Sequence, residues 1–203
     1  MKQQILSLLL ISAVALLSSM APPTYQIGDA VSDFTLKNVD GKMVSLSDYK
    51  SSKGAIVIFD CNTCPYSQAY NDRILQLNKD YAPKGFPVIT INANSPELSP
   101  GDSFQAMVAR AKEKNYDFPY LVDETQSVAR LFGATNTPHV FVLRNDKGNF
   151  KVAYIGTIDN NSRDAGSVTK RYVEDAVNDL LANKEVTTSK TKAIGCGIKW
   201  KNT

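Results

Sequence analysis

Two cysteines three residues apart are the residues best suited to chemistry in this sequence. Cys61 and Cys64 stand in FDCNTCPYSQAY (59–70), directly after an apolar run and directly before a proline and an amphipathic stretch. Such a pair can hold a metal ion, form a structural disulfide, or exchange a disulfide with a substrate. A disulfide that closes so small a loop removes little chain entropy, so a purely structural bridge is the weakest of these interpretations.

The elements expected around the pair place Cys61 where a thiolate is stabilised. Residues 55–60 form an apolar run typical of a strand buried on both faces, and residues 66–81 repeat apolar side chains at helical spacing. We therefore expect Cys61 at the amino end of a helix, where unpaired N–H groups and the helix dipole favour a negative sulfur. Cys64, one turn later, could resolve a mixed disulfide, and Pro65 fits the first turn because its missing N–H costs little there.

The rest of the chain predicts one α/β domain. We expect a hairpin, a strand, a helix, a strand, a helix, a short strand, a helix, a second hairpin and a final helix, over residues 33–46, 55–60, 66–81, 86–94, 104–111, 118–123, 126–132, 139–157 and 168–181. This alternation predicts a largely parallel sheet with helices on both faces, and the last hairpin adds antiparallel pairing. We expect Thr125 to cap the helix that Gly133 ends, and the Lys-rich tail with Trp200 to pack on the core.

Composition and the amino terminus bound the class of protein. The chain has 203 residues, 43% of them hydrophobic and 21% charged, and a net charge of +3, which gives no basis for a nucleic-acid partner. Residues 1–21 combine Lys2, an apolar run and small residues, the layout of a secretory signal peptide. An uncleaved membrane anchor is the alternative. We expect a domain of residues 22–203 that is exported to the periplasm or cell envelope, or secreted, with no stable membrane insertion after cleavage.

The motifs together resemble the thioredoxin superfamily. The resemblance rests on a strand followed by CxxCP on a helix, and on a distant Thr137-Pro138 that opens a late hairpin. Residues 31–50, the insertion between 92 and 118, and residues 118–143 resemble the redoxin branch, which includes the alkyl hydroperoxide reductase and thiol-specific antioxidant group. The tail GCGIKWK (195–201) is similar to the end of one peroxiredoxin-like subgroup. The resemblance implies a thioredoxin fold: a central mixed sheet flanked by helices, with an N-terminal hairpin extension and a helical insertion.

The resemblance also implies roles for individual residues. Cys61 matches the exposed attacking cysteine, and Cys64 matches the buried resolving cysteine. Thr137 and Pro138 match the loop whose cis-proline faces the pair and binds the substrate backbone. The implied protein is a thiol–disulfide oxidoreductase that acts on protein thiols and disulfides, depends on a reducing or oxidising partner protein, and needs no cofactor or metal.

Some positions near the pair depart from thioredoxin. The acid that thioredoxins carry six residues before the first cysteine is Ala55 here, whereas Asp60 stands next to Cys61. Asn62 and Thr63 replace the Gly-Pro between the cysteines, which leaves the direction of electron flow open. Cys196 is a third, unmatched thiol that could relay electrons, pair with another protein, or be a buried spectator.

Two other functions are alternatives to disulfide exchange. The first is a peroxiredoxin-like thiol peroxidase. Such enzymes carry a Pro and then a Thr or Ser at fixed distances before the reactive cysteine, and neither Cys61 nor Cys64 follows this pattern. They also carry an Arg near the late strand, at the position that Pro138 occupies here. A metal site could combine Cys61, Cys64 and His139, the only histidine, which directly follows Pro138. Structural zinc sites use four ligands, however, and a single His at a strand start is more often an ordinary hydrogen-bonded residue. Disulfide exchange is therefore the preferred hypothesis.

Overall fold

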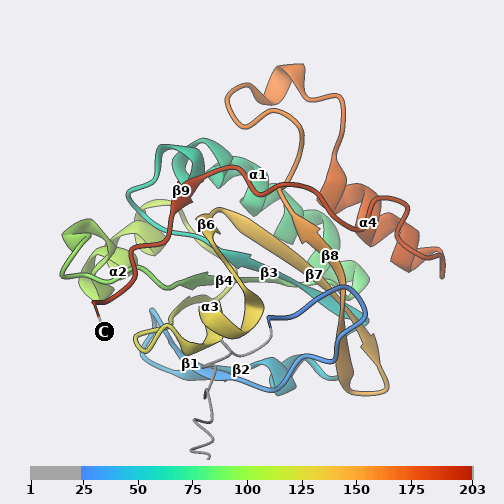
Figure 1. The fold of residues 1–203 in the computed structure, drawn as a ribbon, viewed down its shortest axis with the longest axis horizontal. Coiled ribbons are helices and arrows are strands. Elements are labelled where there is room, and N and C mark those ends of the chain that lie inside the picture. Colours follow the sequence, from blue (N-terminus) through green and yellow to red (C-terminus); the bar gives the residue numbers. More distant parts are fainter. Residues whose placement is uncertain (1–23, 203) are drawn as a thin grey trace, which may run out of the picture.

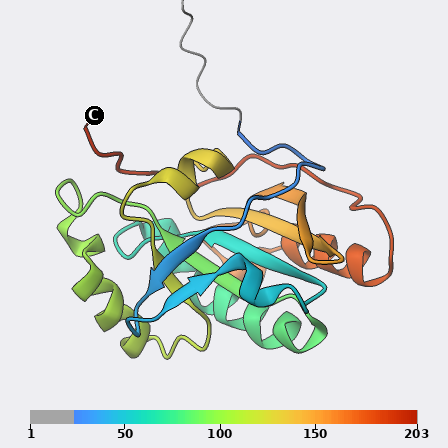
Figure 2. The same cartoon turned by 90° about the horizontal axis from the view of Figure 1, so that it is seen from below.

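A computed structural model describes residues 24–202 of the chain. Its main sheet has seven strands in the order β2-β1-β5-β4-β3-β7-β8, and a separate ribbon pairs β6 with β9 (Figure 1). The strands are β1 (Thr35–Asn38), β2 (Met43–Ser45), β3 (Gly54–Phe59), β4 (Val88–Asn92), β5 (Tyr120–Val122), β6 (Asn136–Thr137), β7 (His139–Asp146), β8 (Asn149–Gly156) and β9 (Cys196–Gly197). The hairpins β1–β2 and β7–β8 form the two ends of the sheet and can be followed in Figure 2 in blue and orange.

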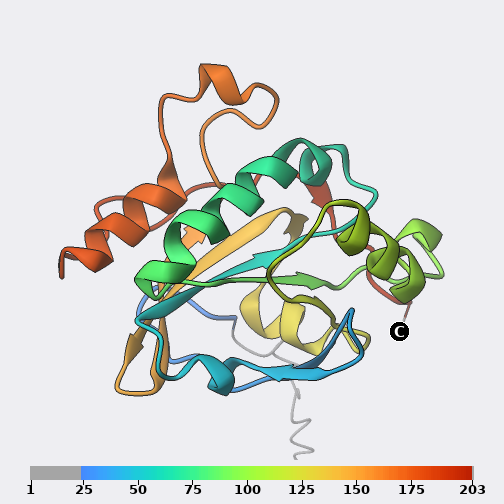
Figure 3. The same ribbon diagram turned by 180° about the vertical axis from the view of Figure 1, so that it is seen from behind.

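The helices cover both faces of this sheet. They are α1 (Pro65–Tyr81), α2 (Phe104–Glu113), α3 (Ser127–Phe132) and α4 (Tyr172–Leu181), with short 3-10 turns at Leu46–Tyr49, Ala82–Lys84, Pro100–Asp102 and Ala165–Ser167. Side chains of β3 alternate between the faces. Ile56 and Ile58 pack with α1 and α4, whereas Val57 and Phe59 pack with α3. Figure 3 shows α1 and α4 together on one side of the sheet and α3 on the other.

The predicted order of elements and the mixed sheet that the resemblance implies are confirmed, whereas the largely parallel sheet expected from the alternation of strands and helices is wrong. Parallel pairing is confined to β3, β4 and β5. The N-terminal hairpin adds to β5 in the antiparallel sense, and β7 lies antiparallel beside β3. The sheet is therefore mixed rather than largely parallel, because strands that return through hairpins occupy both ends.

Two helix starts also differ from expectation. The residue before α3 is Gln126, with φ at 60°, so Thr125 is not its cap. The carboxylate of Asp123 accepts the Ala129 N–H at 2.8 Å and takes the capping role expected of Thr125. The last helix begins at Tyr172 rather than at 168, because the Asn160 side chain binds the N–H groups of residues 169 and 170 and holds them outside the helix.

The carboxyl-terminal segment is a bound strap, which we define as residues 187–201. As expected, it packs on the core: Ile198 is buried in the cluster that contains Phe59, and Arg130 lies 4.5 Å over the Trp200 ring. No pattern in the sequence, however, predicts that residues 196 and 197 form a strand, β9, beside β6 (Figure 1). A two-residue strand is too short to show a period in its sequence.

The amino-terminal prediction lies outside the part of the chain that the structure describes, since the expected signal peptide is residues 1–21. Between residues 24 and 202, no helix combines the length and the apolar character needed to cross a membrane.

Candidate active site

Cys61 and Cys64 lie in the loop between β3 and α1, at the carboxyl end of β3. The expectation that Cys61 begins the helix is wrong. The helix begins at Pro65, and Cys64 is the flanking residue whose carbonyl accepts the first helical hydrogen bond, from the Gln68 N–H at 3.0 Å. Proline is favoured at the first helical position and keeps the residue before it extended. Cys64 accordingly has φ −73° and ψ 125°.

The loop around Thr137 contacts both sulfurs. Cys61 Sγ lies 3.0 Å from the Thr137 hydroxyl and 3.8 Å from the Ser67 hydroxyl. The Cys64 thiol donates to the Thr137 carbonyl at 3.1 Å. The Thr137–Pro138 peptide bond is cis, as the resemblance implies. The structure therefore brings together both predicted cysteines and the predicted Thr-Pro loop.

Cys196, from the strap, is the third cysteine at this point. Its backbone N–H donates to Cys64 Sγ at 3.3 Å, and β9 pairs it directly with Thr137. The strap passes so close that a Cβ on Gly195 would overlap the Thr137 carbonyl, so this position requires glycine. All three thiols are free in this structure.

The cysteine pair is covered. Cys61 is 0% and Cys64 2% exposed, so the expectation of an exposed Cys61 is wrong. Thr137 is likewise buried, and its strand edge is paired with Cys196. The backbone edge that the resemblance assigns to substrate is therefore taken by the strap. Cys196 keeps partial exposure.

The thiol pKa values move in opposite directions. Interaction with the Cys61 thiol lowers the pKa of Cys64 to about 4, against burial, and the Cys196 thiol and the backbone N–H groups of Ser67 and Cys196 add to the lowering. The helix completes no capping hydrogen bond to this side chain, whereas the Cys196 N–H donates to Cys64 Sγ at 3.3 Å. The pKa of Cys61 is raised, by Cys64 first and then by burial and Asp60. Of the two sulfurs, Cys64 is the one whose lowered pKa favours ionisation, and on ionising it gives up the hydrogen bond that its thiol donates to the Thr137 carbonyl.

Asp60 is a buried acid beside the pair. It is 1% exposed, and its Oδ1 has no hydrogen-bond partner in the described part of the chain. Burial raises the pKa of Asp60 to about 6, although Ser67 and Arg110 oppose the shift. A carboxyl group with such a pKa can take up and release protons near neutral pH. Since Ser67 also contacts Cys61 Sγ, a hydroxyl lies between the acid and the more buried thiol.

The segment between the cysteines is fixed by Asp102, a residue that the sequence analysis missed. Asp102 accepts the Asn62 backbone N–H at 2.6 Å and the Thr63 hydroxyl at 2.8 Å. Its other donors are Ser99 Oγ at 2.6 Å, Asn94 Nδ2 at 2.9 Å and Asn92 Nδ2 at 3.2 Å. Burial alone would raise the pKa of Asp102, but these hydrogen bonds outweigh it and lower the pKa. No local pattern in SPELSPGDS indicates this role, because every donor but Ser99 comes from another segment.

Asn62 is locked at both ends of its side chain. Its amide group donates to the Gly101 carbonyl and accepts from the Tyr120 hydroxyl, both at 2.8 Å. Its carbonyl accepts the Gln68 amide at 2.9 Å. The two residues that replace Gly-Pro therefore hold the cysteine loop rigidly on the body of the protein, although Thr63 itself is exposed.

His139 does not join the cysteines. Its Nδ1 accepts the Thr135 N–H at 3.3 Å, and its ring lies 4.7 Å from that of Phe141, on the α3 side of the sheet. Burial lowers the pKa of His139 to about 4, so the ring is neutral. Within residues 24–202, no three His, Cys, Asp or Glu side chains gather as a metal ion would require. The Cys61, Cys64 and His139 ligand set is therefore not assembled.

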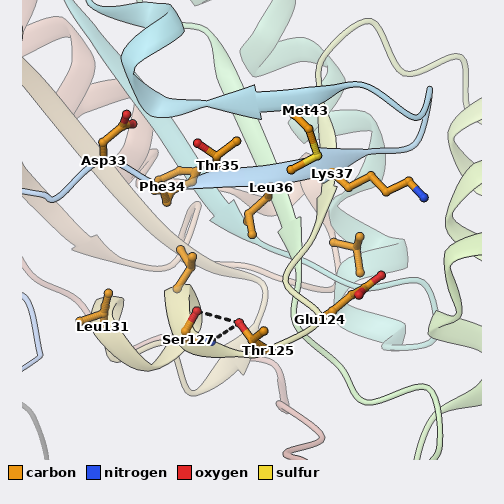
Figure 4. Close-up of a pocket in the computed structure, with 12 residues that line it drawn as sticks. Asp33, Phe34, Thr35, Leu36, Lys37, Met43, Glu124, Thr125, Ser127 and Leu131 are labelled. Carbon is orange, nitrogen blue, oxygen red and sulfur yellow. Dashed lines mark hydrogen bonds between the residues drawn. The ribbon is translucent and has the colours of Figure 1, made fainter.

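A hollow elsewhere on the surface involves none of these residues. It lies between β1 and α3 and is lined by Phe34, Leu36, Lys37, Met43 and Leu131, among others (Figure 4). Thr125 and Ser127 at its rim hydrogen-bond to each other at 2.8 Å. Its lining is separate from the cysteine loop and the strap.

Comparison with known proteins identifies the class of fold and then the family. Two solved structures match 89% of the chain: a conserved protein from Geobacillus kaustophilus (36% identity, 95% of that chain, TM-score 0.82) and a protein from Sinorhizobium meliloti 1021 (31% identity, 98% of that chain, TM-score 0.81). Thiol-disulfide oxidoreductase ResA from Halalkalibacterium halodurans is 26% identical over 129 residues, 64% of this chain and 68% of the relative. The predicted thioredoxin fold is confirmed.

Residues 27–152 match the AhpC/TSA family. The chain belongs to this family, and the predicted redoxin branch is thereby confirmed.

Proposed function

We propose that the protein is an exported thiol–disulfide oxidoreductase that exchanges disulfides with protein partners through Cys61 and Cys64. The observation that carries this proposal is the pairing of two thiols with opposed pKa shifts at the carboxyl end of β3, both in contact with the Thr137–Pro138 loop. Family membership and the similarity to an oxidoreductase support the same function. The signal-peptide pattern of residues 1–21 supports export.

We propose that the two cysteines have the reverse of the roles that the resemblance implies. Cys64 is the nucleophile, because the thiolate is the reactive form and Cys64 is the sulfur whose pKa is lowered. Cys61 is the resolving thiol, because its raised pKa keeps it protonated until a mixed disulfide has consumed the Cys64 charge. Asp60 is placed to accept the Cys61 proton through Ser67.

Each half-reaction is a thiol–disulfide exchange. A thiolate attacks a disulfide sulfur, one S–S bond forms as another breaks, and the leaving sulfur departs as a thiolate. Completion oxidises Cys61 and Cys64 to a disulfide and reduces the substrate to a dithiol, or the reverse. A separate thiol or disulfide partner protein must then restore the starting state.

A thiol peroxidase is the second candidate, and family membership is what favours it. In that reaction Cys64 would attack a peroxide oxygen, form a sulfenic acid and release water or an alcohol. Thr137 Oγ1 supplies a hydroxyl near the pair, but no Arg side chain hydrogen-bonds to either sulfur in the described residues. The leaving oxygen would therefore lack a cationic partner.

Stopped-flow kinetics on the reduced full chain tests the proposal. Free thiol is followed against a protein disulfide and, separately, against hydrogen peroxide, for the wild type, Cys64→Ala and Cys61→Ala. We expect fast reaction with the disulfide, slow reaction with peroxide, and loss of activity in Cys64→Ala. Full activity of Cys64→Ala would contradict the proposal, and faster reaction with peroxide would favour the peroxidase.

A further inference from the structure

The strap pairs with the edge of Thr137, beside the cysteine pair, and it brings a cysteine there. Thr137 pairs with Cys196 in antiparallel register, and the Ile198 N–H donates to the Thr135 carbonyl at 3.1 Å. On the other side of the ribbon, Asn136 Nδ2 donates to the Gly195 carbonyl at 2.9 Å. These contacts hold the cysteine of the strap directly next to Cys64, at the edge that the resemblance assigns to substrate.

The strap is anchored on both sides of Cys196. Upstream, the Ile155 N–H donates to the Ser189 carbonyl at 3.0 Å, and the Thr191 N–H donates to the Ile155 carbonyl at 2.9 Å. Downstream, the Lys199 carbonyl accepts the Ser95 N–H at 2.8 Å. With Ile198 buried, releasing the strap would expose apolar surface and break several hydrogen bonds at once. It is therefore part of the site rather than a loose cover.

We propose that Cys196 is a third redox-active cysteine, which exchanges a disulfide with Cys64 and carries it between the buried pair and the substrate. This inference rests on the proposed function. It follows from the contact between the Cys196 backbone and Cys64 Sγ, the occupied edge of Thr137, and the contrast between two buried cysteines and one partly exposed cysteine. The substrate class is a protein dithiol or disulfide whose sulfur reaches the surface at Cys196.

The relay balances at every step. In the oxidised protein, the Cys196 thiolate attacks Cys64 Sγ, the Cys61–Cys64 bond breaks, and Cys61 leaves as a thiolate that takes up a proton. A substrate thiolate then attacks Cys196 Sγ, and Cys64 leaves as a thiolate. The second substrate thiol displaces Cys196, so the substrate gains a disulfide and the protein ends with three thiols. The pair of electrons that the substrate loses is the pair that the protein gains, and reduction of a substrate is the same sequence reversed.

The charges at the site fit this order. Burial and then interaction with Cys64 raise the pKa of Cys196 to about 11, while Lys199 opposes the shift. Once Cys64 is in a disulfide it carries no charge, so its share of that shift is gone and Cys196 ionises more easily. A thiol of low pKa is the better leaving group, so an external thiol that attacks Cys196 displaces Cys64 readily.

Adduct mapping on the full chain tests the relay. Reduced Cys64→Ala protein is mixed with insulin as the disulfide probe, quenched with acid, digested and analysed by mass spectrometry. Cys196 attacks the probe, and Cys64, the thiol that would displace the probe in the relay, is absent, so we expect the adduct on the Cys196 peptide. An adduct on Cys61 alone, or none, would overturn the relay.

A second measurement separates the relay from the proposed function. We expect Cys196→Ala to lose about tenfold or more of the rate toward the protein disulfide. This variant keeps the backbone N–H on Cys64, and its thermal midpoint checks that it folds. Ile194→Ala, an exposed strap residue with no assigned role, is the matched control and should react as the wild type. Full activity of Cys196→Ala with an inactive Cys64→Ala refutes the relay alone, whereas full activity of Cys64→Ala refutes the proposed function.

Discussion

The assignment of the thiolate to Cys64 gives a prediction that can be measured without a substrate. A thiol at the ordinary cysteine pKa of 9.0 is about 1% ionised at neutral pH, whereas one at about 4 is fully ionised. We therefore expect the thiolate fraction at Cys64 to be about a hundredfold larger than that of an ordinary cysteine. This difference arises from the contacts of the Cys64 sulfur, so the acidic titration should disappear when that sulfur is removed.

Two matched variants test which sulfur titrates. In Cys64→Ala, we expect no thiol to titrate in the acidic range, because burial and Asp60 still raise the pKa of Cys61. In Cys61→Ala, the largest cause of the lowering at Cys64 is removed, so the acidic titration should stay but move toward higher pH. The readout is ultraviolet thiolate absorbance against pH, checked by the rate of alkylation.

The result that would refute this reasoning is an acidic titration that survives in Cys64→Ala and disappears in Cys61→Ala. Cys61 would then be the nucleophile, as the resemblance alone implies, and the assignment of the lowered pKa to Cys64 would be wrong. Both variants are needed for this answer, because both cysteines are buried and each changes the pKa of the other.

Three further predictions concern the residues around the pair. Asp102→Asn replaces a charged acceptor of five hydrogen bonds, and losing one such bond costs ~1.5–3 kcal/mol, so denaturant unfolding should show a loss of at least that size. Burial raises the pKa of Asp60 from 3.8 to about 6, so the contribution of Asp60 to stability is full below about pH 4 and is lost as pH rises through 6. Near neutral pH, Asp60→Asn should therefore be more stable than the wild type by on the order of 3 kcal/mol. In acid, this difference in unfolding free energy should disappear. Gly195→Ala should push the strap from the Thr137 carbonyl and speed alkylation of Cys64, whereas Gly197→Ala, with open space at its Cβ, should not; equal rates in the two variants would argue against the strap as the cover.

Much of the fold follows from the sequence because each element carries its own pattern. The apolar run before Cys61 and the helical spacing after Pro65 are local signals, and both elements form where they predict. The cysteine pair was equally visible from its spacing. The start of the helix was visible too: a proline at the first helical position places the cap at the residue before it, which is Cys64.

The rest of the site depends on contacts that no local pattern encodes. Asp102 acquires its role because Asn62 and Thr63 approach it from the loop between the cysteines, which is distant in the sequence. Cys196 pairs with Thr137, although the two residues are far apart in the sequence. Whether Asp60 faces inward or outward was also undetermined, since a residue just past the end of a strand can turn either way.

Burial and ionisation make opposite demands on Cys64, and the strap reconciles them. Removing a thiol from water favours its neutral form, so the cover over the pair should by itself raise the pKa of Cys64. The same segment that excludes water also supplies the Cys196 N–H, 3.3 Å from the sulfur, and the Cys196 thiol, both of which lower that pKa. The strap is therefore more than a lid, because a chain without it would expose Cys64 and at the same time remove donors that stabilise its charge. The strap therefore controls both access to Cys64 and the reactivity of Cys64. A substrate that reacts at Cys196 can exchange with Cys64 while the strap stays in place and continues to stabilise the Cys64 thiolate.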